Sequence, residues 1–417
     1  MAAGARDWGI TGVSLRGAQV RDQLQPQDCY YTVTQSGNSG HEIRLIGAIR
    51  QVLVSPENPL AVIEALAAAD THIVSLTVTE KGYHRQRDQS LDFAAVALDL
   101  NGAAQTLYGL LARGCALRRD RGLPGLTLLS CDNLANNGQQ LEKLLQQFLE
   151  RIDPSCAAWV RRECRCPDSM VDRIVPATTT QDLAWLDRQL QMHDAAAVMT
   201  EPFRQWVIED RFAGPRPSWE VGGAQWVSRV APYETAKLRM LNGAHSALAY
   251  AGLARGHEFV HQAIADASLA TLVNTLMRDE AAHSFEPAPE QDLDAYADLL
   301  LARFLNCARP HRLQQIAMDG SQKIPQRWLE TLRSAQSQRR RCPALLRALG
   351  AWIAFVRGDR FPVDDPAALE LAQLWRDHGV AGIAGALFGP GGRFTQWTAS
   401  PEELELLTSA VRGYLPA

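Results

Sequence analysis

The sequence has 417 residues and a mass of 45.9 kDa, a length that favours two domains. Hydrophobic residues make up 46% and charged residues 21%, which excludes wholesale disorder. The 42 Lys and Arg residues against 46 Asp and Glu residues leave a net charge of -4, so the basic excess typical of a nucleic-acid binder is missing. No apolar run approaches the roughly 18 residues that span a bilayer, and the N-terminus has no apolar signal core. We therefore expect a soluble, cytoplasmic protein without a nucleic-acid or membrane partner.

Apolar β-type runs alternate with helical patterns over the first two hundred residues. Several of the runs are apolar on both faces, which is typical of a sheet covered by helices on each side. This alternation predicts an open α/β sheet. The expected strands are Trp8–Leu15, Cys29–Gln35, Ile43–Val54, His72–Thr79 and Leu126–Cys131, and the expected helices are Pro59–Ala69, Leu91–Arg113 and Gln139–Arg151.

The second half of the chain has a different pattern. From Glu234 onward, apolar residues recur every three to four positions among Ala, Leu, Gln, Arg and Glu, which predicts an all-helical domain. A stretch rich in Gly and Pro precedes it and is expected to connect the two parts. We place the domains at residues 1–230 and 231–417.

The eight cysteines are scattered through the chain and are expected to be reduced thiols. Cys164 and Cys166 form a lone C-x-C pair, which lacks the other two ligands of a structural zinc site. We therefore expect no metal at this pair.

The helical half opens with PYETAKLRMLNGAHS, which places Lys237, Asn242 and His245 at spacings of five and three residues. On an α-helix these side chains fall within an arc of about 140°. A cation, an amide and an imidazole on one face can bind an oxygen-rich substrate and handle its proton. The alternative is a solvated polar face, although Met240 and Leu241 place apolar side chains beside the set.

Polar residues also follow two expected strands. Asn133 comes directly after Leu126–Cys131, and ligands of open α/β sheets lie beyond the carboxyl ends of the strands. Helix capping is the alternative role for such an asparagine. Glu80 follows the strand His72–Thr79 in the same way. A further polar cluster, MDGSQKIPQR, holds Lys323 and Arg327 and would otherwise be a loop between helices.

The segment GHEFVHQAI contains an H-E-x-x-H motif at His257–His261, with Glu280 downstream. Two histidines one helical turn apart can bind Zn²⁺ while the glutamate acts as general base. A zinc metallopeptidase is therefore an alternative function, and the other interpretation is a helix with surface or packing histidines.

Taken together, the segments resemble the long-chain mannitol dehydrogenase family, which includes mannitol 2-dehydrogenases, fructuronate reductases and tagaturonate reductases. The stretches that carry the resemblance are WGITGVSLR, LTVTEKGY, SCDNLANNG, PDSMVDRIVPAT, EPFRQWVIEDRF, PYETAKLRMLNGAHSALAY and IAMDGSQKIPQR. They run in family order over nearly the whole chain. The resemblance implies a Rossmann-like N-terminal domain, a helical catalytic domain and a metal-free, NAD-dependent reaction between a secondary alcohol and a ketone.

The resemblance also implies roles for individual residues. Lys237 would be the general acid/base, Asn133 and Asn242 would bind the reacting oxygen, and His245 would position the substrate. Glu234 would lie on the proton route to solvent. Lys323, with Arg327 or Arg312 as a further cation, would contact the substrate, and Ser14, Arg16 and Glu80 would lie near the cofactor. TEKGY and MDGSQKIPQR look more like fructuronate reductases, so we expect a sugar acid of the fructuronate or mannonate type, with a mannitol- or arabinitol-type polyol as the alternative.

The chain departs from the family pattern at its start. Family members begin with a strand and a glycine-rich G-x-G-x-F-x-R-A-H loop, whereas this sequence starts near the second strand and has no G-x-G-x-x-G after an early strand. We therefore expect a Rossmann-like domain that lacks its first strand and phosphate loop, and a catalytically impaired remnant is a third alternative. Arg16 at the end of the first expected strand makes NADP possible beside NAD. The expected form is a monomer or small homo-oligomer.

Overall fold

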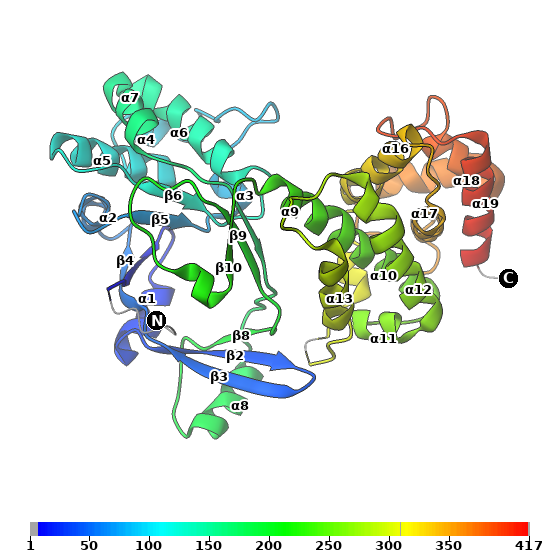
Figure 1. Ribbon diagram of the computed structural model, residues 1–417, viewed down its shortest axis with the longest axis horizontal. Helices are drawn as coiled ribbons and strands as arrows, with labels where there is room; N and C mark the ends of the chain where they lie inside the picture. The colour runs from blue at the N-terminus through cyan, green and yellow to red at the C-terminus, as the bar shows by residue number, and fades with distance from the viewer. Residues whose placement is uncertain (1–6, 309, 416–417) are drawn as a thin grey trace. The chain divides into compact units, whose positions relative to one another are not determined.

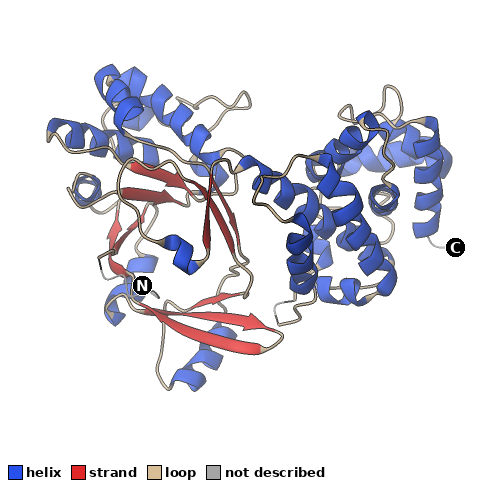
Figure 2. Ribbon diagram, viewed as in Figure 1, coloured by secondary structure: helices blue, strands red, loops and turns tan. Residues whose placement is uncertain are grey.

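The computed structural model describes residues 7–308 and 310–415, and the chain divides into two compact units between Ala231 and Pro232 (Figure 1). Among the described residues, every strand lies in the first unit and the second unit is built from helices (Figure 2). No helix in the described part of the chain is long and apolar enough to cross a membrane.

Two pairs of parallel strands form the centre of the first unit. Strand β1 (Ile10–Ser14) pairs with β4 (Ile49–Val54), and β5 (Ile73–Leu76) pairs with β6 (Thr127–Ser130). All four residues of β6 are buried because helices cover this pair. The covering helices are α2 (Pro59–Leu66), α5 (Leu107–Asp120), α6 (Asn137–Ile152) and α7 (Pro154–Glu163), whose apolar faces share one core with Leu126 and Leu128.

The starts of β1 and β5 lie side by side. Trp8 lies two residues before β1 and His72 directly precedes β5, and their rings meet edge to face with centroids 5.6 Å apart. In the described residues β1 and β5 each pair with a strand along one edge only. The two parallel pairs are therefore neighbouring parts of the unit without a strand hydrogen-bonded between them.

Two further sheets complete the first unit. Strand β2 (Tyr31–Gly37) runs antiparallel to β3 (Gly40–Ile46) and parallel to β8 (Val198–Thr200). Strand β9 (Gln205–Glu209) lies between β7 (Ser169–Asp172) and β10 (Ala224–Val227). The remaining α-helices of this unit are α1 (Gln19–Leu24), α3 (Thr79–Gly82), α4 (Ala97–Leu100) and α8 (Thr180–Leu190), and its 3-10 turns are η1 (Gln25–Gln27) and η2 (Trp219–Gly222).

Three expected elements need correction. The expected strand Ile43–Val54 is divided between β3 and β4, because its two halves pair with different partners. The expected helix Leu91–Arg113 is interrupted after α4, where the Asp99 carboxylate accepts hydrogen bonds from the backbone N–H groups of Gln105 and Thr106 at 2.8 and 2.9 Å. Thr106 then caps α5. The expected strand His72–Thr79 ends at Leu76 as β5, and Thr79 begins α3.

The second unit surrounds a central helix, α10 (Asn242–Ala254), in which most residues are buried. It packs against neighbours on several sides, including α11 (Val260–Ala265), α12 (Ala267–Thr275), α14 (Leu313–Ile316) and α17 (Pro343–Phe355). The other elements of this unit are α9 (Ala231–Ala236), the π-helical segments η3 (Lys237–Leu241), η4 (Leu276–Ala281) and η6 (Pro325–Leu329), the 3-10 turn η5 (Ala282–Ser284), α11 (Val260–Ala265), α12 (Ala267–Thr275), α13 (Leu293–Phe304), α14 (Leu313–Ile316), α15 (Gly320–Ile324), α16 (Glu330–Ser337), α17 (Pro343–Phe355), α18 (Ala368–Phe388) and α19 (Pro401–Tyr414).

Candidate functional site

Lys237 and Asn242 lie at the two ends of a π-turn. The segments α9, η3 and α10 follow one another without a break, and the backbone N–H of Asn242 donates to the carbonyl of Lys237. Because this bond joins residue i to residue i+5, about one turn of the backbone separates Lys237 from Asn242. Their side chains therefore lie closer together around the helix axis than the spacing of a regular α-helix predicted. π-Turns inside α-helices occur frequently at functional sites. Glu234 lies in α9, three residues before Lys237.

His245 follows in the first turn of α10 and is half-buried. Its ring packs against Phe304 with centroids 4.8 Å apart and meets His311 at 6.0 Å. Burial, together with the nearby charges of Arg303, His311 and Arg327, holds the pKa of His245 well below its usual value. The imidazole is therefore neutral at physiological pH and can donate one hydrogen bond and accept another.

Arg327 holds η6 against the start of α10. Its Nη1 donates to the Asn242 carbonyl at 3.4 Å and to Ser246 Oγ at 2.7 Å. The neighbouring Trp328 donates from Nε1 to the Gly243 carbonyl at 3.1 Å. Burial lowers the pKa of Arg327, although a guanidinium stays charged. The structure therefore brings Arg327 beside Asn242.

Lys323 lies one turn before Arg327, in α15. Its Nζ donates to the Met318 carbonyl at 2.6 Å and lies 3.9 Å from Asp319. Burial lowers the pKa of Lys323, the positive charge of Arg327 lowers it further, and Asp319 opposes both. Arg327 thus contacts Asn242 and acts electrostatically on both His245 and Lys323.

In the first unit, Asn133 is exposed in the turn between β6 and α6. The preceding residue, Asp132, is buried and fixes this turn. Its carboxylate accepts from the backbone N–H groups of Val78 at 3.0 Å and Thr79 at 2.8 Å, and from the Tyr83 hydroxyl at 2.8 Å. The ends of β5 and β6 are therefore held together by one carboxylate.

Asn137 secures the other side of the same turn. Its side-chain amide donates to the carbonyls of Asp132 at 3.0 Å and Ser169 at 2.8 Å, and its oxygen accepts from the Ser169 N–H at 2.9 Å.

Thr79 has a φ of 65°, a left-handed conformation that is unusual for a β-branched residue and is concentrated at functional sites. Sequence reasoning did not identify the positioning role of Asp132 or Asn137, because their partners lie some 30 to 50 residues away.

Glu80 and the residues after β1 occupy the ends of the neighbouring strands. Glu80 is exposed and pairs with Arg85 at 2.9 Å. The Ser14 hydroxyl donates to the Gly17 carbonyl at 2.6 Å, so it shapes the turn that follows β1. Arg16 in that turn is exposed.

The sequence matches the Mannitol dehydrogenase Rossmann domain over residues 2–221 and the Mannitol dehydrogenase C-terminal domain over residues 229–381. It is 37% identical over 409 residues to D-mannonate oxidoreductase of Escherichia coli (strain K12), covering 93% of this chain and 83% of that protein. It is 36% identical over 385 residues to mannitol 2-dehydrogenase of Pyricularia oryzae, covering 88% of this chain and 77% of that protein. The chain belongs to the mannitol dehydrogenase family.

Solved structures agree with this assignment. A D-sorbitol dehydrogenase in substrate-free form superposes with a TM-score of 0.87 at 28% identity, covering 99% of this chain and 90% of that chain. Mannitol 2-dehydrogenase of Pseudomonas fluorescens, in a ternary complex with NAD and D-mannitol, gives a TM-score of 0.75 at 32% identity and covers 99% and 86%. The family and the combination of a Rossmann-type domain with a helical domain are therefore confirmed, and the chain is an oxidoreductase of this mannitol dehydrogenase family.

The strand ends of the first unit fit a nicotinamide dinucleotide in part. The exposed guanidinium of Arg16 after β1 suits a phosphate group, and Asn133 offers an exposed amide after β6. The 417 residues contain no G-x-G-x-x-G loop.

The H-E-x-x-H segment lacks the geometry of a zinc peptidase. His257 precedes α11, whereas His261 lies inside it, so the two histidines do not share one helical face. Glu258 is exposed and pairs with Arg312. Glu280 is buried in η4, where it accepts from the backbone N–H groups of Ala344 and Leu345 at 2.7 and 2.8 Å. In the described residues no cluster of three or more His, Cys, Asp or Glu side chains could hold a metal ion.

Proposed function

We propose that this chain interconverts a secondary alcohol and a ketone on a sugar acid or polyol, using NAD or NADP and no metal. The observation that carries the proposal is the π-turn that joins Lys237 to Asn242, with His245 and Arg327 beside it. Its support from outside the chain is the family, which includes a D-mannonate oxidoreductase and a mannitol 2-dehydrogenase complex with NAD.

In the proposed reaction Lys237 takes the hydroxyl proton of the alcohol, and a bound nicotinamide would supply the hydride chemistry. A free lysine has a pKa of about 10.4, so the site must lower it for this work. The amides of Asn242 and Asn133 donate hydrogen bonds to the developing alkoxide, which is the role that a metal would otherwise have. Glu234 then passes the proton toward solvent.

The residues around this centre have positioning roles. The neutral ring of His245 donates to a substrate hydroxyl and orients the reacting carbon. Residues 1–230 bind the dinucleotide through the turns at Ser14, Arg16 and Glu80, and residues 231–417 bind the substrate. The proposed cofactor is NAD, and NADP is possible because the guanidinium of Arg16 can bind a 2′-phosphate.

We propose a sugar acid of the fructuronate or mannonate type as the substrate. Its carboxylate requires a cationic partner, and Lys323 and Arg327 form a neighbouring cationic pair in the helical unit. A polyol such as mannitol is the second candidate, because mannitol 2-dehydrogenases are similar over most of the chain.

The test is an assay of NADH and NADPH oxidation by the purified chain against fructuronate and fructose. The sugar-acid proposal predicts faster turnover of fructuronate, and a Lys323→Ala variant should raise KM for fructuronate by about tenfold while leaving that for fructose unchanged. Preference for fructose that Lys323→Ala does not alter would favour the polyol candidate. No turnover of either ketone by the folded chain would favour the catalytically impaired alternative.

A further inference from the structure

The helical unit contains a pocket of about 500 Å³ at the C-terminal end of α10, beside α17 and α19. This volume lies within the range of pockets that bind small molecules. α10 has 13 residues, so the pocket lies about 20 Å along the helix from Asn242. Its lining residues are Ala254, Arg255, Arg347, Arg360, Ala410, Gly413, Tyr414 and Leu415.

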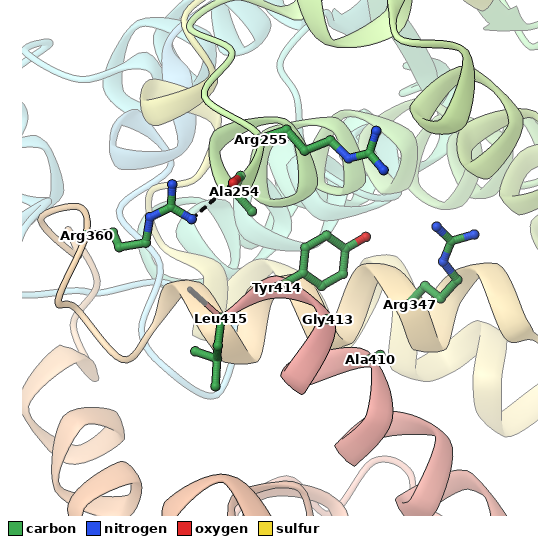
Figure 3. A pocket seen from close by; sticks show the side chains of 8 residues that line it. All are labelled: Ala254, Arg255, Arg347, Arg360, Ala410, Gly413, Tyr414 and Leu415. Atoms are coloured by element: carbon green, nitrogen blue, oxygen red, sulfur yellow. Dashed lines mark hydrogen bonds between the residues drawn. The ribbon is translucent and has the colours of Figure 1, made fainter. Parts of the chain in front are cut away.

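Three of the eight lining residues are arginines and none is acidic. Figure 3 shows Arg255, Arg347 and Arg360 arranged around Tyr414, with the hydroxyl of Tyr414 on the side of Arg255 and Arg347. Arg255 is neutralised by Asp266 at 2.7 Å and also donates to Ser268 at 3.1 Å. The positive charges of Arg347 and Arg360 have no matching carboxylate in the lining.

A neutral acceptor holds Arg360 in place. Arg360 donates from Nη1 to the Ala254 carbonyl at 3.0 Å, at the end of α10 (Figure 3). Arg347 lies on the hydroxyl side of Tyr414 (Figure 3). Burial raises the pKa of Tyr414, against the opposing effect of Arg347 and Arg255, so this hydroxyl keeps its proton at neutral pH. The pocket therefore offers two guanidinium groups and one hydroxyl donor.

We propose that this pocket binds a small phosphomonoester, such as a sugar phosphate. A phosphate dianion balances the charges of Arg347 and Arg360, and guanidinium groups bind phosphate oxygens in a paired geometry. The Tyr414 ring and the side chains of Ala410 and Leu415 supply an apolar wall for the carbon skeleton of the ligand. This site is separate from the proposed catalytic residues, and its occupancy does not depend on the oxidoreductase reaction.

The test is calorimetric titration of the full chain with glucose 6-phosphate, with glucose and inorganic phosphate as matched probes. We expect saturable binding of one glucose 6-phosphate per chain and no binding of glucose at this site. Arg347→Gln and Arg360→Gln should each weaken binding by about tenfold or more, the effect of losing a charge-assisted hydrogen bond. The control Arg376→Gln changes an exposed arginine of α18 outside the pocket and should leave the affinity unchanged.

Three results would overturn the proposal. Equal affinity of the wild type and both pocket variants would place the ligand elsewhere. Binding of inorganic phosphate without binding of glucose 6-phosphate would exclude an organic phosphate as the ligand. Failure of glucose 6-phosphate to bind at millimolar concentration, with circular dichroism showing a folded chain, would exclude the site.

Discussion

The two units fix their candidate residues in different ways. In the first unit, Asn133 lies in an exposed turn that is held by one buried carboxylate, Asp132, and by Asn137. In the second unit, Asn242 and His245 lie within a long helix, where Arg327 and Trp328 secure the backbone from a neighbouring segment. A strand-end site thus depends on a few hydrogen bonds, whereas a helix-borne site is supported along its length. The predictions below test this difference.

The largest effect is expected at Lys237. Replacing it with Ala should lower turnover by about a thousandfold, since general acid/base catalysis contributes this order of rate. The free energy of unfolding should change by less than about 1 kcal/mol, because the half-buried side chain lies in an intact helix. Lys143→Ala, at an exposed position of α6, is the control and should keep full turnover. Retained activity in Lys237→Ala would contradict the acid/base role.

The next effect concerns the turn of the first unit. Asp132→Ala removes the acceptor of the Val78 and Thr79 N–H groups and of the Tyr83 hydroxyl, and should lower the free energy of unfolding by about 4 kcal/mol. Urea unfolding measures this change. Asp88→Ala, at an exposed carboxylate that bonds only within its own turn, should cost less than about 1 kcal/mol. Equal losses in both variants would contradict the anchoring role of Asp132.

The helical unit has its own buried carboxylate, Glu280. The pH dependence of unfolding tests whether this carboxylate also contributes to the stability of its unit. Burial raises the pKa of Glu280 to about 7, although two backbone N–H donors oppose the rise. Because the folded-state pKa lies above the unfolded value of about 4.5, the folded state retains the proton more strongly. The contribution of protonated Glu280 to the free energy of unfolding is fully present below pH 4.5 and is lost as the pH rises through about 7. The free energy of unfolding should fall by about 3 kcal/mol over this range.

Urea unfolding at pH 5 and pH 8 measures this loss, with Glu280→Gln as the comparison. The variant cannot titrate at this position, so its stability should fall less than that of the wild type over the same interval. An identical pH dependence in the two proteins would show that Glu280 does not titrate there.

The smallest effect is expected at Ser246. Ser246→Ala removes one acceptor of Arg327 but leaves the Asn242 carbonyl in place, so the free energy of unfolding should fall by about 1.5 kcal/mol. KM for the keto substrate should change by less than about twofold. A loss as large as that of Asp132→Ala would show that the helix-borne residues also depend on single hydrogen bonds.

Local patterns predicted the regular parts of the fold. The apolar run Leu126–Cys131 and the helical pattern Gln139–Arg151 correspond to β6 and α6, because a continuous apolar run and a strongly periodic helical pattern both indicate their own structure. The strands β7 to β10 were not predicted, since their sequences lack the continuous leucine-rich run that marks β6. The break between β3 and β4 was missed for the same reason, because pairing partners determine it.

The candidate site was predictable as a set of residues but not as a geometry. The spacing of Lys237, Asn242 and His245 identified one side of a helix, yet no residue pattern in the sequence predicts the π-turn at η3. The hydrogen bonds of Arg327 to α10 likewise span more than eighty positions. The signal available in the sequence was residue type near a strand or helix end. It identified the polar cluster that contains Asp132 and Asn133, but not the anchoring role of the Asp132 carboxylate.

The most direct test of the account is a fluorescence titration of the purified chain with NADH and then NADPH, after circular dichroism has shown that the chain is folded. The account predicts saturable binding at micromolar concentration, with Arg16→Gln weakening NADPH binding more than NADH binding. A folded chain that binds neither dinucleotide would contradict the proposed oxidoreductase function.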